Sequence, residues 1–133
     1  MSDQFGYLDT NIFVHALFPR DAQYARCRAI LAALEQGTGE GVLDPLVIHE
    51  LTYILLRLPH FPDRAAVDVY LRDLLRMTGV QAAQRPLLLA ALSRWASRGG
   101  GFVDAWLATL ALTDGQPVCS ANVRDVPDVD NTF

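Results

Sequence analysis

The sequence predicts an α/β domain with a short parallel sheet. Short apolar segments alternate with longer segments of helical periodicity along the chain, and this alternation is typical of parallel strands joined by helices. The 133 residues fit a single domain covering residues 1–133, and 51% of them are apolar. A chain of this size and composition can bury a core without disulfides or a structural metal.

Five short segments are predicted to be extended, each bounded by turn-forming residues or by a helix. The first of them ends at Leu8, directly before Asp9, and the fourth ends at Ala121, directly before Asn122. The last is expected to be an edge strand, because prolines interrupt the acidic tail. These segments cover residues 5–8, 41–43, 80–83, 117–121 and 126–129.

Helices are expected between these segments, with start and stop signals at most of their ends. Asp21 is expected to cap one helix that Gly37 ends, and Asp44 followed by Pro45 starts another that stops before Pro59. The predicted helices span residues 10–17, 22–36, 44–58, 64–77, 86–98 and 102–113.

Composition and charge exclude several classes of function. The chain has 11 arginines, no lysine and 15 acidic residues, so its formal charge is −4. An acidic chain is a poor general nucleic-acid binder, and any such contact should be local and metal-assisted. The longest apolar run, residues 87–92, falls far short of the ~20 residues that span a bilayer. Cys27 and Cys119 match no zinc motif, and we expect a cytoplasmic protein without membrane contact.

Polar side chains follow two of the predicted strands. Asp9 comes directly after the first strand, and Asn122 and Asp125 come after the fourth. Ligands of open parallel sheets gather beyond the carboxyl ends of the strands, so these residues are candidates for a site. The alternative is that Asp9 caps the following helix and that Asp125 belongs to a polar turn.

The charges farther along the tail give no such signal. Asp128 and Asp130 are expected to be solvated.

Glu50 is expected to point into the apolar stripe of its helix. It lies three residues after Val47 and four before Ile54, which places it on that face. A buried carboxylate costs several kcal/mol unless a metal, an arginine or a proton offsets its charge. The alternative is a glutamate at the edge of the stripe that reaches water and pairs with Arg57.

Asp104 is expected in the first turn of the helix over residues 102–113. The helix dipole alone would favour a carboxylate there by roughly 0.3–1 kcal/mol. The rest of that helix is uncharged up to Asp114, and Val103 and Leu107 suggest that it is deeply buried. Asp104, a charged group at the start of such a helix, is therefore another candidate for the site.

Together these acids form a set of oxygen ligands without thiolates or paired histidines, which suits Mg²⁺ or Mn²⁺ rather than zinc. Arginines near the proposed site, including Arg26, and the nearby His15 fit ordinary surface positions better than substrate contacts.

Four motifs occur in the order and at the intervals of a known family. They are Leu8-Asp9-Thr10-Asn11, Ile48-His49-Glu50-Leu51, Phe102-Val103-Asp104-Ala105 and Ser120-Ala121-Asn122-Val123-Arg124-Asp125. In these motifs the chain resembles PIN-domain ribonucleases and, in size and layout, the VapC-type toxins of bacterial toxin–antitoxin pairs.

The resemblance implies a three-layer α/β/α fold and Mg²⁺- or Mn²⁺-dependent cleavage of RNA. Asp9, Asp104 and Glu50 would match the family's acidic positions, and Thr10, Asn11 and Ser120 would support them. The family often has an aspartate where this chain has Asn122, so a second metal would bind more weakly there, with Asp125 as a substitute. The resemblance also implies a cognate antitoxin protein and a homodimer.

Two other functions remain open at this point. The first is a catalytically weakened PIN-like module that binds a protein, which the amide of Asn122 favours. The second is a phosphatase-type domain with Asp9 as nucleophile. Such sites usually need a lysine or an Asp-x-Asp pair, and this chain has no lysine and carries Asn11 two residues after Asp9.

Overall fold

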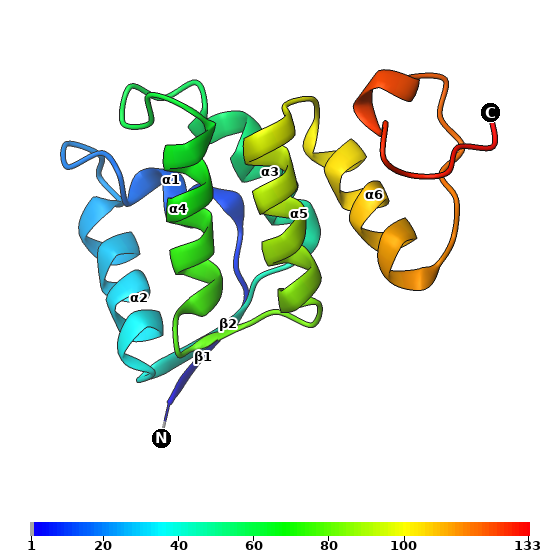
Figure 1. The fold of residues 1–133 in the computed structure, drawn as a ribbon. Helices are drawn as coiled ribbons and strands as arrows, with labels where there is room; N and C mark the ends of the chain where they lie inside the picture. Colours follow the sequence, from blue (N-terminus) through cyan, green and yellow to red (C-terminus); the bar gives the residue numbers. More distant parts are fainter. Residues whose placement is uncertain (1) are drawn as a thin grey trace.

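The computed structural model describes residues 2–133 apart from the side chain of Asp125, and it confirms the predicted α/β class. Its sheet has three parallel strands in the order β1-β2-β3, flanked by helices (Figure 1). The strands are β1 (Asp3–Tyr7), β2 (Gly39–Val42) and β3 (Val80–Gln81).

Six helices are present in the described part of the chain, at or near the predicted positions. They are α1 (Thr10–His15), α2 (Tyr24–Gln36), α3 (Pro45–Leu55), α4 (Arg64–Arg76), α5 (Arg85–Arg98) and α6 (Phe102–Asp114). Helix α2 packs on β2, α4 packs on β3, and α1 packs on both α2 and α3. The main core lies between these elements, and leucine, isoleucine and phenylalanine side chains fill most of it.

The predicted helix ends are correct where a capping residue determines them. The Asp44 carboxylate accepts a hydrogen bond from Leu46 N at 2.9 Å, and Gly37 ends α2 with a φ of 79°. The prediction that Asp21 caps α2 is wrong, because its carboxylate bonds Gln23 N in a turn before the helix. Helix α3 ends at Leu55 rather than at residue 58, since the next residues continue as turns.

The two strands predicted near the C-terminus do not form. Val118 makes one isolated parallel bridge to Asn131 instead of joining the sheet, because its backbone bonds run to Asp130 and Thr132. Residues 126–129 are not a strand either. Val126 and Val129 pack with Ala108, Ala111 and Val118 in a small second cluster, so the tail has its own core.

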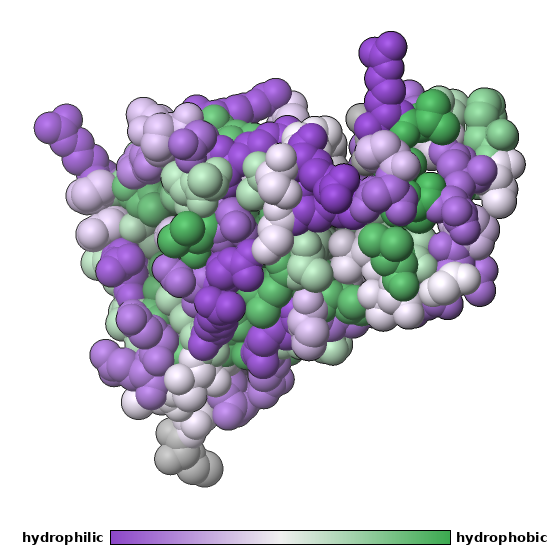
Figure 2. Space-filling model, viewed as in Figure 1, coloured by the Kyte–Doolittle hydropathy of each residue, from purple (hydrophilic) through white to green (hydrophobic). Residues whose placement is uncertain are grey.

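Helix α6 and the tail stand to one side of the sheet (Figure 1). The helix packs mainly on α5 and also touches α3. Apolar side chains reach the surface over this part of the molecule (Figure 2), and Leu112, Val123 and Phe133 are among the exposed ones. Among residues 2–133, no helix combines the length and the apolar character that a bilayer crossing requires.

Three glycines allow β2 to approach its neighbours closely. A Cβ at Gly39 would lie 2.4 Å from the Phe5 ring, and one at Gly41 would lie 2.8 Å from the Leu8 side chain. The tightest position is Gly79, where a Cβ would lie 1.9 Å from the carbonyl oxygen of Gly39. Backbone atoms cannot turn aside as a side chain can, so Gly79 is the least replaceable of the three.

We therefore expect Gly79→Ala to lower the free energy of unfolding by about 3 kcal/mol, the upper end for overpacking. The control is Gly115→Ala, whose Cβ would meet nothing within 4 Å but would sit at a φ of 67°. That variant should lose only about 1 kcal/mol, the cost of a left-handed residue. Urea unfolding measures both, and equal losses would contradict the role given to Gly79.

Candidate functional site

Asp9 lies between the end of β1 and the start of α1, as the sequence predicts. It is the N-cap of α1, and its Oδ1 accepts a hydrogen bond from Thr10 N at 2.7 Å. The Asp9 side chain is exposed and has no ion-pair partner among the described residues, whereas Thr10 is buried beneath it. Asp9 is thus both a helix cap and a carboxylate with a free oxygen, and the next exposed polar side chain is Asn11.

Glu50 does not point into the core, and the expectation that it does is wrong. The buried face of α3 consists of Ile48, Leu51, Thr52 and Leu55, and Glu50 lies on the exposed side. This buried face is rotated about the helix axis from the predicted stripe of Val47 and Ile54. The reason is that α3 packs against α1, α4 and α6 on the side of Ile48.

The suggested pairing of Glu50 with Arg57 is absent as well. Arg57 bonds the Tyr53 hydroxyl and lies 4.0 Å above its ring centroid. Glu50 is therefore an exposed carboxylate without a cation beside it among the described residues.

Asp104 lies in the first turn of α6, where it is half-buried. The deep burial expected of this helix is only partly correct, because Val103 is 47% and Leu107 is 44% exposed. Its buried face is made instead by Phe102, Ala105, Ala108, Thr109 and Ala111. The rings of Phe102 and His49 stack with centroids 6.2 Å apart, which holds the start of α6 against the helix that carries Glu50.

The remaining predicted residues lie in the tail. The Ser120 hydroxyl accepts a hydrogen bond from Asn122 N at 3.1 Å, and Asn131 bonds the backbone of Ser120 on both sides. Asn122 is exposed at the start of a 3-10 turn, Val123–Asp125. The Asp125 side chain lies outside the described residues. These contacts hold residues of the tail to one another and not to β1.

A family model for the PIN domain matches residues 6–130. The chain belongs to the PIN domain family. No curated protein and no solved structure matches it. The PIN domain family consists generally of nucleases that use divalent metals, so the donor groups of this chain can be compared with that chemistry.

The donor chemistry of this PIN domain fits a hard cation. Asp9, Glu50 and Asp104 offer oxygen atoms only, and within residues 2–133 none of the three has an ion-pair partner. The three carboxylates do not form a compact cluster, however. Among the described side chains, no group of three or more His, Cys, Asp or Glu lies close enough to hold a metal ion. The three carboxylates are thus available but not gathered.

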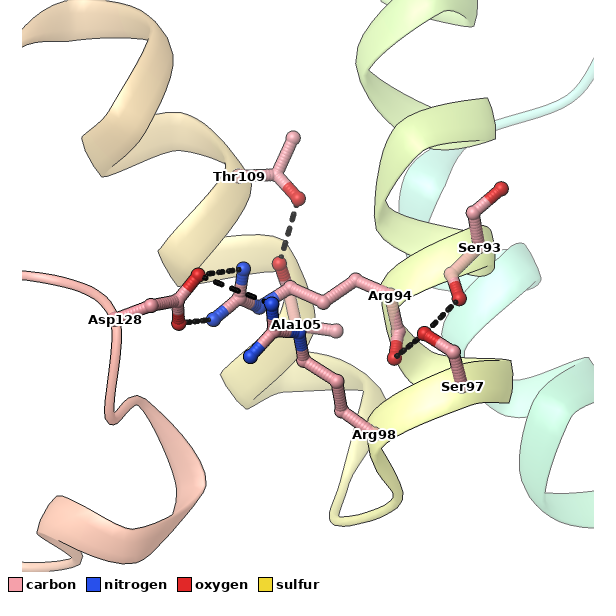
Figure 3. Close-up of polar contacts among 7 residues, drawn as sticks. All are labelled: Ser93, Arg94, Ser97, Arg98, Ala105, Thr109 and Asp128. Carbon is pink, nitrogen blue, oxygen red and sulfur yellow. Dashed lines mark hydrogen bonds and ion pairs between the residues drawn. The ribbon is translucent and has the colours of Figure 1, made fainter.

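An ion-pair cluster that sequence analysis missed holds the tail of the PIN domain to α5 (Figure 3). Arg94 donates two hydrogen bonds to Asp128, the longer at 2.9 Å, and Arg98 lies 3.5 Å from the same carboxylate. The expectation that Asp128 is merely solvated is therefore wrong. The bonds from Arg94 hold the pKa of Asp128 below its ordinary value. The sequence offers no periodic signal for this contact between residues 34 positions apart.

The lowered pKa makes part of the stability dependent on pH. A carboxyl group whose pKa is lower in the folded state contributes stability above its unfolded pKa, and that contribution is lost as pH falls through the folded value. We expect Asp128→Asn to cost up to about 1 kcal/mol at pH 7, the upper range for a partly exposed pair. The difference from the unmodified protein should shrink below about pH 4.

Urea unfolding at pH 7 and pH 3 measures this difference. Asp130→Asn serves as the control, because its side chain has no ion-pair partner among the described residues. A loss in Asp128→Asn that is the same at both pH values would contradict the ion-pair interpretation.

Proposed function

We propose that this PIN domain is a metal-dependent endoribonuclease that hydrolyses RNA phosphodiester bonds and acts as the toxin of a toxin–antitoxin pair. The observation that carries the proposal is the family match over residues 6–130, which includes Asp9, Glu50 and Asp104. All three side chains are at least partly accessible and none is neutralised by an arginine within the described residues. A structural role accounts for the capping by Asp9 and for Asp104 in the first turn of α6, but the structure shows none for Glu50.

Asp9, Asp104 and Glu50 would hold Mg²⁺ or Mn²⁺. The bound ion would lower the pKa of a coordinated water and stabilise charge on the phosphate and the leaving oxygen. The carboxylate of Asp9 is oriented for this task by its bond to Thr10 N, and the buried Thr10 fixes the start of α1. Asn122 and Asp125 would contribute to a second, weaker position, with Ser120 supporting the backbone of Asn122.

The toxin role is inferred from the size and layout shared with VapC-type toxins. A cognate antitoxin protein would cover the acidic site, and the toxin would form a homodimer. Both cysteines are free, the first buried and the second exposed, which is compatible with a reducing cytoplasm where RNA substrates occur.

A second candidate is a PIN-like module that binds a protein and has lost most of its catalysis. Two observations favour it: the amide of Asn122 at a position often acidic in the family, and the open arrangement of the carboxylates. The two functions differ in one measurable respect, since a binding module would not cleave RNA at any metal concentration.

We expect Asp9→Asn and Asp104→Asn each to abolish cleavage of tRNA or rRNA in the presence of Mn²⁺, because each removes a charged ligand. The control is Asp114→Asn, which removes an exposed carboxylate at the other end of α6 and should leave cleavage unchanged. Circular dichroism should show that all three variants fold. Full cleavage by the unmodified protein in excess chelator would disprove the metal-dependent mechanism.

We expect Glu50→Gln to reduce cleavage at least tenfold, as for a residue that orients or completes a metal site. Its stability should change by less than about 0.5 kcal/mol, because the side chain is exposed and unpaired. Glu35→Gln, an exposed position on α2, is the matched control for both measurements. A large loss of stability together with normal cleavage would instead assign Glu50 a structural role.

A further inference from the structure

A cavity of about 360 Å³ opens between α1 and α2. Its lining begins at Asn11, two residues after Asp9 and therefore within one turn of α1, about 5 Å. The other lining residues come from the same two helices and from the turn between them: Ile12, His15, Gln23, Arg26, Cys27 and Ile30. The cavity is thus a neighbour of the proposed acidic site, although no acidic residue lines it.

Its lining combines polar hydrogen-bonding groups with apolar side chains. Ile12, Cys27 and Ile30 are apolar, whereas Arg26 brings N–H donors and His15 brings a ring nitrogen. Among the described residues, the Arg26 guanidinium has neither an ion-pair partner nor a hydrogen-bond acceptor, unlike Arg72, Arg85 and Arg94, which are all engaged. An unneutralised arginine beside a cavity can accept an anion bidentately.

A hydrogen bond to Asp21 holds the His15 ring in place. Its Nδ1 lies 2.6 Å from Oδ2 of Asp21, and Oδ1 of Asp21 accepts a bond from Gln23 N at 2.7 Å. Both oxygens of Asp21 are therefore occupied, and the bond fixes the orientation of the imidazole. Nε2 of His15 has no partner within the described chain, and with Nδ1–H donated to Asp21 the neutral ring presents Nε2 to a ligand as an acceptor.

We propose that this cavity binds a phosphate of the RNA strand that flanks the cleaved bond, with Arg26 as the charged contact, Asn11 as a donor to the phosphate and Nε2 of His15 as an acceptor for a hydroxyl of the attached sugar. The proposal rests on the proposed ribonuclease function and names a binding subsite for its substrate. Asn11 lies two residues after Asp9, so the cavity is within reach of an RNA strand whose scissile bond lies at Asp9. The chain carries a net charge of −4, so a local cation without a carboxylate partner is what a polyanion requires there.

The test measures RNA binding separately from cleavage. In the inactive Asp9→Asn background without metal, fluorescence anisotropy follows binding of a labelled single-stranded 12-nucleotide RNA at several salt concentrations. Arg26→Gln should raise the Kd about fivefold to tenfold and lower the salt slope by about 0.7, the value for one phosphate contact on a single strand. Arg28→Gln removes an exposed arginine of the same helix that does not line the cavity, and it should change the Kd less than twofold.

Cleavage assays on the same substitutions without Asp9→Asn complete the test. Arg26→Gln and His15→Ala should raise KM while kcat stays within about twofold. If the unmodified protein cleaves RNA but Arg26→Gln matches it in KM and in RNA affinity, the subsite is wrong and the ribonuclease function stands. If no cleavage occurs but RNA affinity still depends on Arg26 and not on Arg28, the subsite stands and the ribonuclease function fails. Equal effects of Arg26→Gln and Arg28→Gln on RNA affinity would overturn the subsite. It would also be overturned if Arg26→Gln weakened the binding of an antitoxin peptide but left the binding of RNA unchanged.

Discussion

The close approach of β2 to β1 is the constraint on which the position of the site depends. The side chains of Phe5 and Leu8 fill the space that a Cβ at Gly39 or Gly41 would need, so β2 can have only glycine at these two positions. The parallel pairing of β1 with β2 is irregular between Gln4 and Gly6, and it ends with a bond from Leu8 N to the Val42 carbonyl at 2.9 Å. This bond holds the chain just before Asp9, so the carboxylate enters α1 at a fixed point. A bulkier residue in β2 would move the strand end and Asp9 with it.

The sequence predicts the fold well wherever a local signal determines structure. Caps such as Asp44 and stops such as Gly37 act within one turn, and the structure has helix ends at both. The C-terminal strands were not predictable in the same way. Residues 117–121 have the composition of a strand, but strand formation requires a partner, and the backbone of Val118 finds its partners in the tail. A choice between two distant partners is a tertiary property, which no periodicity within the segment encodes.

The candidate site shows the same division between local and tertiary information. Asp9 and Asp104 occupy the predicted places at helix starts, because helix starts are marked in the sequence. For Glu50 the periodicity identifies a helix but leaves its orientation open by a fraction of a turn, and the packing of α3 turns Glu50 outward. The cavity beside Arg26 depends on how α1 and α2 meet. Its lining residues are consequently unremarkable when they are considered one at a time.

The division of the core separates the proposed ligands into two groups. Phe102 and Ala105 at the start of α6 belong to the main core, so Asp104 is anchored in the same packing unit as Asp9 and Glu50. The second cluster begins only at Ala108, and it carries the tail with Asn122. The helix starts and the helix that carry Asp9, Glu50 and Asp104 thus share one packing unit, although among the described side chains no three acidic groups lie close enough to hold an ion. The tail is held separately, by the second cluster and by the bonds between Arg94 and Asp128. The structure therefore carries Asp9, Glu50 and Asp104 on the main core and Asn122 on a separately packed tail.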